Sequence, residues 1–384
     1  MYLAPLGKQF NGAEESDIEC GQRILMQFKD ISVHYAYLDI TSKKFNSMFN
    51  FYANHSNTNI LDKLYFAWHS ITSPDYTLRQ GYTFENFIFI KRICEKYQID
   101  LIFTNTSSTF LFGRQKGRRH IHRSVCFEPF YVLRSVSNSI KSRFHSFLKL
   151  FTVLKELQAD GVAVISPRDQ NYYELVNKLL CTKTKIEVIP LRQFYFPSNN
   201  LKRIKSISTI SIAFLGSTYN VLHNMKSLEF MVTNLDENFL ETHNFYLNLY
   251  GSKFPNSIQD SDRIKTHKWV KDINEIYSLN TCFVVPYFLN SGMQSKVFEP
   301  LINGRILICD PRTLSNYDFR PFKHFIPAVS GDDFKSALVW VKNNREASLK
   351  IGEAALLESR RMIGRDTIHA TLNKLLYLNS LNEK

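Results

Sequence analysis

Short apolar runs alternate along the chain with longer stretches in which apolar positions recur every three or four residues. The runs predict buried strands, and the longer stretches predict amphipathic helices. In the first half, strands are predicted over 1–5, 31–38, 100–103, 120–126, 161–165 and 186–190. Helices are predicted between them over 15–28, 57–71, 83–97, 136–158 and 169–180. Such alternation is typical of a parallel sheet covered by helices.

The second half repeats this rhythm after a polar, basic stretch over 191–207, which we interpret as an inter-domain linker. It predicts strands over 210–215, 245–250, 264–266, 282–286 and 305–309. Helices are predicted over 224–235, 273–279, 294–302 and 332–380. The fold class is therefore α/β, with two Rossmann-like, doubly wound parallel sheets. A ligand is expected at the carboxyl ends of the strands, in a cleft between the domains.

The predicted domain organisation has four parts. The N-terminal domain spans 1–190, the linker spans 191–207 and the second domain spans 208–365. A C-terminal helix over 366–384 packs back on the first domain.

Composition narrows the classes of function. The chain of 384 residues is 44% hydrophobic, so it can bury substantial cores, and its net charge is +13. That charge favours polyanionic partners: nucleic acid, an anionic membrane or a phosphate-bearing ligand. No apolar run approaches the roughly 18 residues of a membrane span, and no secretory signal is visible. The six cysteines are scattered, which argues against zinc. These features predict a cytoplasmic protein, either soluble or peripheral to a membrane.

The most informative segment follows the strand at 282–286. A loop containing Gly292 leads into a helix that begins near Met293. A helix N-terminus offers free N–H groups and a partial positive charge, which bind phosphate. Lys296 adds a full charge, and Glu299 lies on the same face, where its carboxylate can accept two ribose hydroxyls. The alternative is an ordinary helix start with a surface Lys–Glu pair.

Residues 292–299, followed by 304–308, resemble the nucleotide-sugar signature of the group 1 glycosyltransferases, which are retaining enzymes of the GT-B fold. Further stretches agree with that family in order and spacing: 159–166, 188–190, 212–217 with Asn224, 249–251 and 267–270. The resemblance covers 159–310 well. It covers the first 158 residues loosely, through Gly12 and Asp100.

The resemblance implies that the C-terminal domain holds a nucleotide-diphosphate sugar. Lys296 would bind the diphosphate and Glu299 the ribose, and the backbone at Val270 would face the base. The other implied donor-site residues are Gly216, Ser217, Gly292, Met293, Gln294 and Ser295. Gly12 would lie on the acceptor side, and neither a cofactor nor a metal is implied.

One position departs from the family pattern. Many members have a carboxylate that touches the donor sugar eight residues before the position of Glu299, and this chain has Ser291 there. The donor sugar is therefore left unassigned.

The acceptor is expected in the N-terminal half. From Arg114 to Lys149 there are nine Lys or Arg and one acid, Glu128. The resemblance suggests that His122 or Glu128 lines the cleft near the sugar, where either would orient or deprotonate the attacking hydroxyl, and both join Lys296 in the predicted catalytic set. The alternatives are a hydrogen-bonded histidine within a strand and a salt-bridge partner, respectively.

The helix over 136–158 carries a stripe of Phe and Leu beside several cations. It is either a core helix with a solvated basic rim or a surface for an anionic membrane. The triplet Asp260-Ser261-Asp262 matches a metal-binding pattern of transferases with a different fold, but it sits in a polar loop, and we do not expect it to bind metal.

Together these features predict a retaining, metal-independent hexosyl or deoxyhexosyl transferase. The expected acceptor is the hydroxyl of a growing surface glycan or of a lipid-linked sugar, and the expected location is the cytoplasm or the inner face of the membrane. The alternatives are a basic nucleic-acid-binding protein, a GT-B epimerase and an inactive scaffold.

Overall fold

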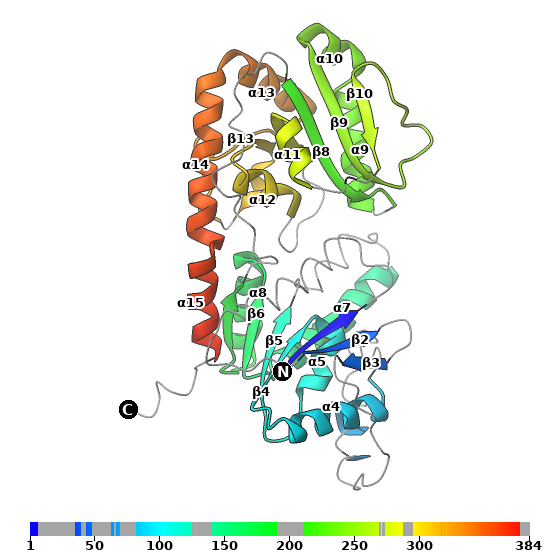
Figure 1. Ribbon diagram of the computed structural model, residues 1–384, viewed down its shortest axis with the longest axis vertical. Coiled ribbons are helices and arrows are strands. Elements are labelled where there is room, and N and C mark those ends of the chain that lie inside the picture. Colours follow the sequence, from blue (N-terminus) through cyan, green and yellow to red (C-terminus); the bar gives the residue numbers. More distant parts are fainter. Residues whose placement is uncertain are drawn as a thin grey trace. The chain divides into compact units, whose positions relative to one another are not determined.

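The chain divides into two compact units in the computed structural model (Figure 1). The first unit runs to Gln193 and takes in the chain again from Ile368, and the second begins at Phe194 and ends at Thr367. The structure describes residues 1–6, 35–39, 44–47, 63–64, 67–69, 82–124, 127, 129, 140–189, 210–220, 222–268, 270, 273–286, 295–315 and 317–376.

The first unit is built on a seven-stranded sheet in the order β3-β2-β1-β4-β5-β6-β7. All neighbours are parallel except the edge pair β2 and β3. The strands are β1 (Tyr2–Leu6), β2 (Tyr35–Asp39), β3 (Lys44–Ser47), β4 (Leu101–Asn105), β5 (Arg119–Ser124), β6 (Gly161–Val164) and β7 (Lys185–Val188). The longer helices described here are α4 (Phe84–Lys96), α5 (Ser107–Gly113), α7 (Ile140–Glu156) and α8 (Pro167–Leu179).

The second unit is built on a parallel, six-stranded sheet in the order β10-β9-β8-β11-β12-β13. Its strands are β8 (Ile210–Thr218), β9 (Phe245–Ser252), β10 (Ile264–His267), β11 (Cys282–Val285), β12 (Ile306–Cys309) and β13 (Ile326–Pro327). Its helices are α9 (Leu222–Asn234), α10 (Glu237–His243), α11 (Ile273–Leu279), α12 (Ser295–Ile302), η1 (Pro311–Leu314), α13 (Gly331–Asn343) and α14 (Arg345–Ile363). This strand order is that of a doubly wound Rossmann-type sheet, as predicted.

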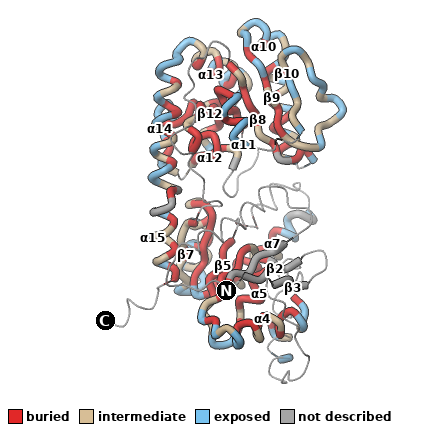
Figure 2. The backbone as a smooth tube through the Cα atoms, in the orientation of Figure 1, coloured by how far each residue is buried: buried red, intermediate tan, exposed pale blue. Residues whose placement is uncertain are grey.

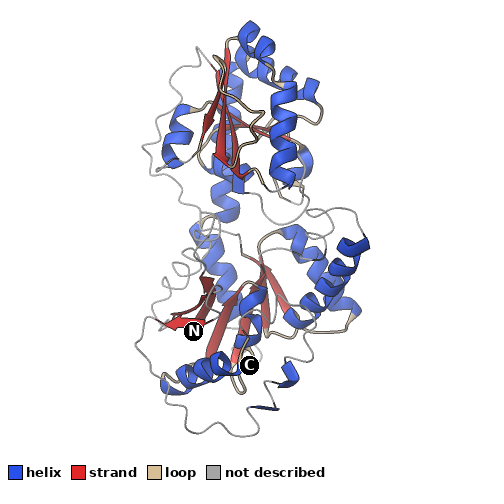
Figure 3. Cartoon of the chain, turned by 90° about the vertical axis from the view of Figure 1, so that its right-hand side faces the viewer, coloured by secondary structure: helices blue, strands red, loops and turns tan. Residues whose placement is uncertain are grey.

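The middle of the second sheet is buried (Figure 2), and every residue of β11 and β12 is buried. Because successive side chains of a strand point to opposite faces, the sheet is covered on both faces there. On β11, Cys282 and Val284 join the core formed with α9, α10 and α13. Phe283 points the other way and packs against the Tyr277 ring of α11, with 5.4 Å between ring centroids. Helices therefore lie on either side of the sheet (Figure 3).

Local sequence explains where several helices begin. Ser330 and Asp333 form a reciprocal capping box at the start of α13, and Ser166 caps α8 with Pro167 as its first residue. Such caps satisfy backbone N–H groups that have no partner within the helix. Gly304, two residues after the end of α12, has a φ of +62°, a left-handed conformation that suits glycine.

The C-terminal helix α15 (Arg365–Leu376) ends against the first unit. The guanidinium of Arg119 donates to the carbonyls of Leu376 and Leu375 at 2.6 and 3.2 Å, and Lys185 Nζ donates to the carbonyl of Lys374 at 3.3 Å. Cations at a helix C-terminus neutralise its partial negative charge.

Among the described elements, the sequence did not predict β3, α5, α10, η1 and β13. The predicted helix over 15–28 and the predicted linker over 191–207 lie outside the described residues, and the helix predicted over 57–71 is described only at 63–64 and 67–69, which are helical.

Candidate active site

The order of the second sheet reverses between β8 and β11. These two strands are neighbours, but the chain leaves β8 toward β9 on one side and leaves β11 toward β12 on the other. Ligands of doubly wound sheets bind at the carboxyl ends of the strands flanking such a reversal. The chain segments that follow these two ends lead into α9 and α12. The topology therefore brings the start of α9 next to the start of α12.

Lys296, in the first turn of α12, meets α9 at this point. Its Nζ atom donates to Oδ1 of Asn224 at 3.3 Å and lies 5.4 Å from the centre of the Phe214 ring. Nδ2 of Asn224 in turn donates to the carbonyl of Thr218, at the end of β8, at 3.0 Å. The amide of Asn224 thus links the ammonium to the sheet and fixes its direction.

The Lys296 side chain is half-buried, and burial lowers its pKa to about 8. It is therefore charged at neutral pH. Within the described part of the chain no carboxylate pairs with it. A desolvated ammonium without a carboxylate partner favours an anionic ligand, because the ligand supplies the charge that the protein does not.

Glu299 lies one turn further along α12 and is 8% exposed. Its Oε2 atom accepts a hydrogen bond of 2.5 Å from the hydroxyl of Tyr277, a buried residue of α11. The phenol holds the carboxylate in one orientation, as expected for a group that positions ligand hydroxyls. The sequence reading missed Tyr277, because nothing in the chain links residue 277 to residue 299.

The two glycines at the ends of β8 and β9 have a structural explanation. A Cβ atom on Gly216 would lie 2.6 Å from the Tyr219 ring. One on Gly251, whose φ is +155°, would lie 2.2 Å from the carbonyl oxygen of Gly216. The two backbones approach closely beneath the tyrosine, so these positions require glycine even without a ligand.

Val270, predicted to face the base, is half-buried and follows the end of β10. There the ring of His267 stacks on that of Tyr250, with 4.5 Å between centroids and 15° between planes. Nε2 of His267 is hydrogen-bonded to Oδ1 of Asn248 at 2.9 Å, and burial lowers the pKa of His267. The strand end beside Val270 therefore carries a neutral stack of two rings.

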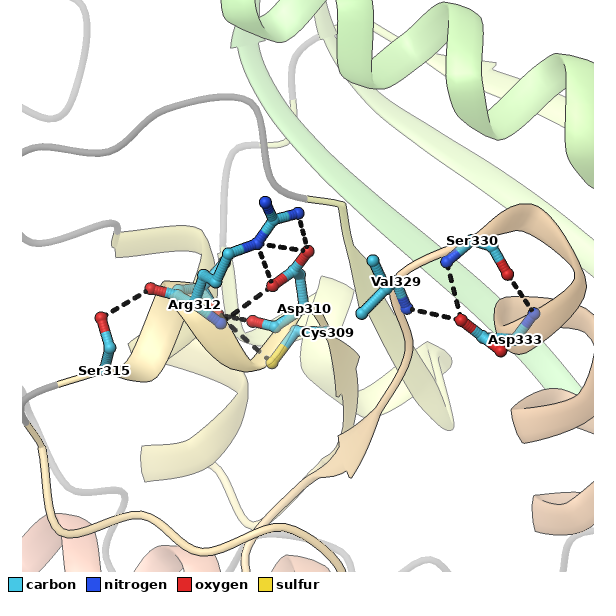
Figure 4. A network of polar contacts seen from close by, with 8 residues as sticks. Cys309, Asp310, Arg312, Ser315, Val329, Ser330 and Asp333 are labelled. Carbon is cyan, nitrogen blue, oxygen red and sulfur yellow. Dashed lines mark hydrogen bonds and ion pairs between the residues drawn. The ribbon is translucent and has the colours of Figure 1, made fainter.

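The loop after β12 is also tightly held (Figure 4). Asp310, at the carboxyl end of β12, is buried and accepts two hydrogen bonds, of 2.9 and 3.1 Å, from Nε of Arg312. A third, of 2.5 Å, comes from Nη2. The Asp310 carboxylate is thereby neutralised, so it does not oppose an anion at the neighbouring strand ends.

In the first unit, His122 lies inside the protein. It is 0% exposed, with Nδ1 hydrogen-bonded to the hydroxyl of Thr104 at 2.8 Å and Nε2 to Oε1 of Glu156 at 3.0 Å. Ser107 donates to the same Glu156 oxygen at 2.8 Å, and Tyr173 donates to the other oxygen. This is the geometry of the hydrogen-bonded strand histidine that the sequence left open as the alternative. We therefore leave His122 out of the catalytic set, since both ring nitrogens are occupied.

Next to it, His120 Nε2 is hydrogen-bonded to the Thr104 hydroxyl at 2.7 Å. Burial lowers the pKa of His120 well below its ordinary value, and His122 and Arg114 act in the same direction. A Cβ atom on Gly113 would lie 2.2 Å from His120 Nε2, so α5 must end in glycine to pack here.

The triplet at 260–262 has a structural role in its loop. Oδ1 of Asp260 accepts from the backbone N–H and the hydroxyl of Thr266, at 2.8 and 2.7 Å. Among the residues that the structure describes, no group of three or more His, Cys, Asp or Glu is placed to hold a metal ion. No helix of the described chain is both long and apolar enough to cross a bilayer.

Several predicted site residues lie outside the described residues. They are Gly12, Glu128, Ser291, Gly292, Met293 and Gln294, together with the side chains of Ser217 and Ser295.

Comparison with proteins of known structure identifies the class of the fold. No family model and no curated protein matches the chain. Solved structures do match it along its whole length. Sucrose-phosphate synthase from Thermosynechococcus elongatus is 14% identical, with a TM-score of 0.62 and coverage of 100% of both chains. A glycosyltransferase from Rickettsia africae is 14% identical, with a TM-score of 0.58 and coverage of 98% of both chains.

Anabaena HepE in complex with UDP is 11% identical, with a TM-score of 0.61, and the match covers 98% of this chain and 99% of that one. The matched structures include glycosyltransferases of the GT-B fold, among them sucrose-phosphate synthase and a trehalose-phosphate synthase. Together with the two doubly wound sheets, these likenesses show that the chain has a GT-B type α/β fold.

Proposed function

We propose that the chain is a retaining glycosyltransferase that moves a hexosyl or deoxyhexosyl group from a nucleotide-diphosphate sugar to a hydroxyl acceptor. The observation that carries this proposal is the Lys296 ammonium, half-buried at the reversal point of the second sheet without a carboxylate partner in the described chain. The GT-B type fold supports it, since structures with this fold include complexes with UDP.

In the proposed reaction, the bond between the anomeric carbon and the diphosphate oxygen breaks, and its electron pair goes to the diphosphate. The acceptor oxygen forms the new bond on the same face of the sugar, and its proton leaves to a base, for which Glu128 remains the sequence-based candidate. Charge develops on the departing diphosphate, and fixed donors aimed at such charge are usually the largest catalytic contribution. Lys296 is that donor.

Glu299, oriented by Tyr277, holds the ribose hydroxyls, and the backbone at Val270 faces the base. The other donor-site residues proposed from the sequence surround the diphosphate and the sugar: Gly216, Ser217, Gly292, Met293, Gln294 and Ser295. Gly12 is assigned to the acceptor side, and no cofactor is required. We place the reaction in polysaccharide biosynthesis in the cytoplasm.

A thermal-shift panel tests the proposal. UDP, GDP, ADP and CDP are compared with single-stranded oligonucleotides, each with and without Mg²⁺. One of the diphosphates is expected to raise the Tm by about 5 °C at about 100 times its Kd, without Mg²⁺.

Two results, one from this panel and one from product analysis, would contradict the proposal. A shift with oligonucleotides alone would favour the nucleic-acid-binding alternative. A diphosphate that binds while its sugar form is never transferred, in mass-spectrometric product analysis with and without acceptors, would favour an epimerase or an inactive scaffold.

The surface of α7 supports a lipid-linked acceptor. Ile140, Phe144 and Phe147, spaced to share one face of the helix, are 86%, 63% and 56% exposed, and Arg143 is exposed beside them. Residues 130–155 contain five Lys or Arg and no Asp or Glu. An apolar face among cations suits an anionic lipid surface. We propose that this face binds the membrane that carries the acceptor.

Co-sedimentation with phosphatidylcholine–phosphatidylglycerol vesicles tests this surface. Phe144→Ser together with Phe147→Ser is expected to weaken binding at least about tenfold, because two phenyl groups no longer enter the interface. Leu179→Ser, at a residue of α8 that is 74% exposed, is the matched control and should bind as wild type does. Equal binding by all three proteins, or binding insensitive to salt, would remove the membrane from the proposal.

A further inference from the structure

His223 is the second residue of α9 and lies beside the Lys296 site. The next residue, Asn224, accepts the hydrogen bond from the Lys296 ammonium, so the imidazole and the ammonium belong to adjoining turns of two helices. The ammonium is close enough for its charge to act on the imidazole. The sequence reading passed over His223, although a histidine in the first turn of a helix after a strand is a detectable signal.

The imidazole is desolvated and incompletely hydrogen-bonded. Its Nδ1 atom is buried and makes no hydrogen bond in the described part of the chain. Burial, and then the charge of Lys296, lower the pKa of His223 to about 4. The ring is therefore neutral near pH 7, and Nδ1 lacks the partner that buried polar atoms normally have.

The other charged groups around α9 do not account for the lowered pKa of His223. β8, on which α9 packs, has no ionisable side chain. α13 carries Asp332, Asp333, Lys335 and Lys342, but its start meets the far end of α9, where Phe334 packs on Phe230 and Gly331 meets Asn234. On α9 itself, Lys226 and Glu229 are exposed. Lys296 is the charge that acts on His223.

An anion bound next to Lys296 would raise the pKa of His223 again. It would cancel the repulsion between the ammonium and an imidazolium, and it would offer an acceptor for an imidazole N–H. A diphosphate spans more than one anionic group, so the ammonium and the imidazolium can each contact one.

We propose that His223 is a second ligand of the donor diphosphate and that it gains a proton when the diphosphate binds. This inference rests on the proposed function, since it takes the anion at Lys296 to be a nucleoside diphosphate. It makes donor binding sensitive to pH near neutrality, because a His ligand must be protonated where a Lys ligand already is.

Isothermal titration calorimetry of UDP at pH 7, in PIPES and in imidazole buffer, measures the protons taken up on binding. Wild type is expected to take up about half a proton or more beyond the uptake by His223→Asn. Lys296 takes up the same small fraction of a proton in both proteins. UDP, whose terminal phosphate titrates near pH 6, releases the same fraction of a proton in both. These two contributions therefore cancel when the uptake by the variant is subtracted from that by wild type. His223→Asn is also expected to raise the Kd about tenfold.

Two variants complete the test. His223→Arg keeps a cation that does not titrate near pH 7, and we expect it to bind within about threefold of wild type with the proton uptake of His223→Asn. His243→Asn, at the end of α10, is the matched histidine control and should behave as wild type.

Equal proton uptake by wild type and His223→Asn would overturn this inference even if the variant binds more weakly. Failure of UDP, GDP, ADP and CDP alike to bind would instead contradict the proposed function, and this inference with it.

Discussion

Replacing Lys296 with alanine is expected to lower kcat by about 100- to 1000-fold, the largest effect on activity that we predict. Loss of one fixed donor to a developing charge typically costs about 2.7–4 kcal/mol of transition-state stabilisation. The fold should be little affected, because burial already disfavours the ammonium, as its lowered pKa shows. Steady-state kinetics on the donor found in the thermal-shift panel measures the effect.

The pH profile gives a second readout for Lys296. With its pKa at about 8, the side chain is an ammonium below that pH and a neutral amine above it. The kcat/KM of wild type, which reports the free enzyme, should therefore fall above pH 8 by up to about tenfold per unit. Bound diphosphate raises the lysine pKa, so kcat should decline at a higher pH than kcat/KM does.

Lys226→Ala, at an exposed residue of α9, is the matched control for lost charge and should retain wild-type turnover. A folded Lys296→Ala protein that works within about threefold of wild type would contradict the assignment of Lys296 to the diphosphate.

The order of strands and helices could be predicted because parallel strands buried on both faces give apolar runs. Residues 282–285 of β11 and 306–309 of β12 are fully apolar, and both stand within a residue of their predicted bounds. α5 and α10 were missed because each has only seven residues, which is too short to show helical periodicity. β3 was missed because an edge strand such as Lys44–Ser47 has few apolar positions.

The candidate site was predictable where its residues lie close together in sequence. Lys296 and Glu299 share one face of α12, so their spacing alone suggested a common ligand. Asn224 was noted only as part of the resemblance, and Tyr277 and His223 were not noted. Their roles arise from the crossing of chain segments some 20 to 70 residues apart, which the reversal between β8 and β11 brings together.

The N-terminal half shows the opposite difficulty. The sequence of β5, with His120 and His122 in a strand followed by Glu128, offered two candidates with catalytic chemistry. The structure engages His122 with Glu156 of α7, 34 residues away, in a fully buried contact. A buried acid near the end of a Phe-rich helix has no sequence signature. The sequence alone therefore could not distinguish a catalytic histidine from a buried histidine that is hydrogen-bonded to Glu156.

Glu156→Ala is expected to destabilise the first unit by about 3–5 kcal/mol, the largest stability effect that we predict. The carboxylate accepts from Ser107 and Tyr173 and is hydrogen-bonded to His122, and it is 0% exposed. Truncation leaves several buried polar groups without their acceptor, and removing one partner from a buried ionic network costs about this much. Because the chain has two units, hydrogen exchange resolved by peptide is the suitable measurement.

Protection should fall in β4, β5 and α8, whose residues Thr104, His122 and Tyr173 share the network, and it should be unchanged in β8, β9 and β11. Glu156→Gln keeps one acceptor oxygen and should lose less stability, because part of the network survives. Glu174→Ala, at an exposed residue of α8, is the matched control and should stay within about 0.5 kcal/mol of wild type. If β5 were as well protected from hydrogen exchange in Glu156→Ala as in Glu174→Ala, the network would not stabilise the unit. His122 would then again be a catalytic candidate.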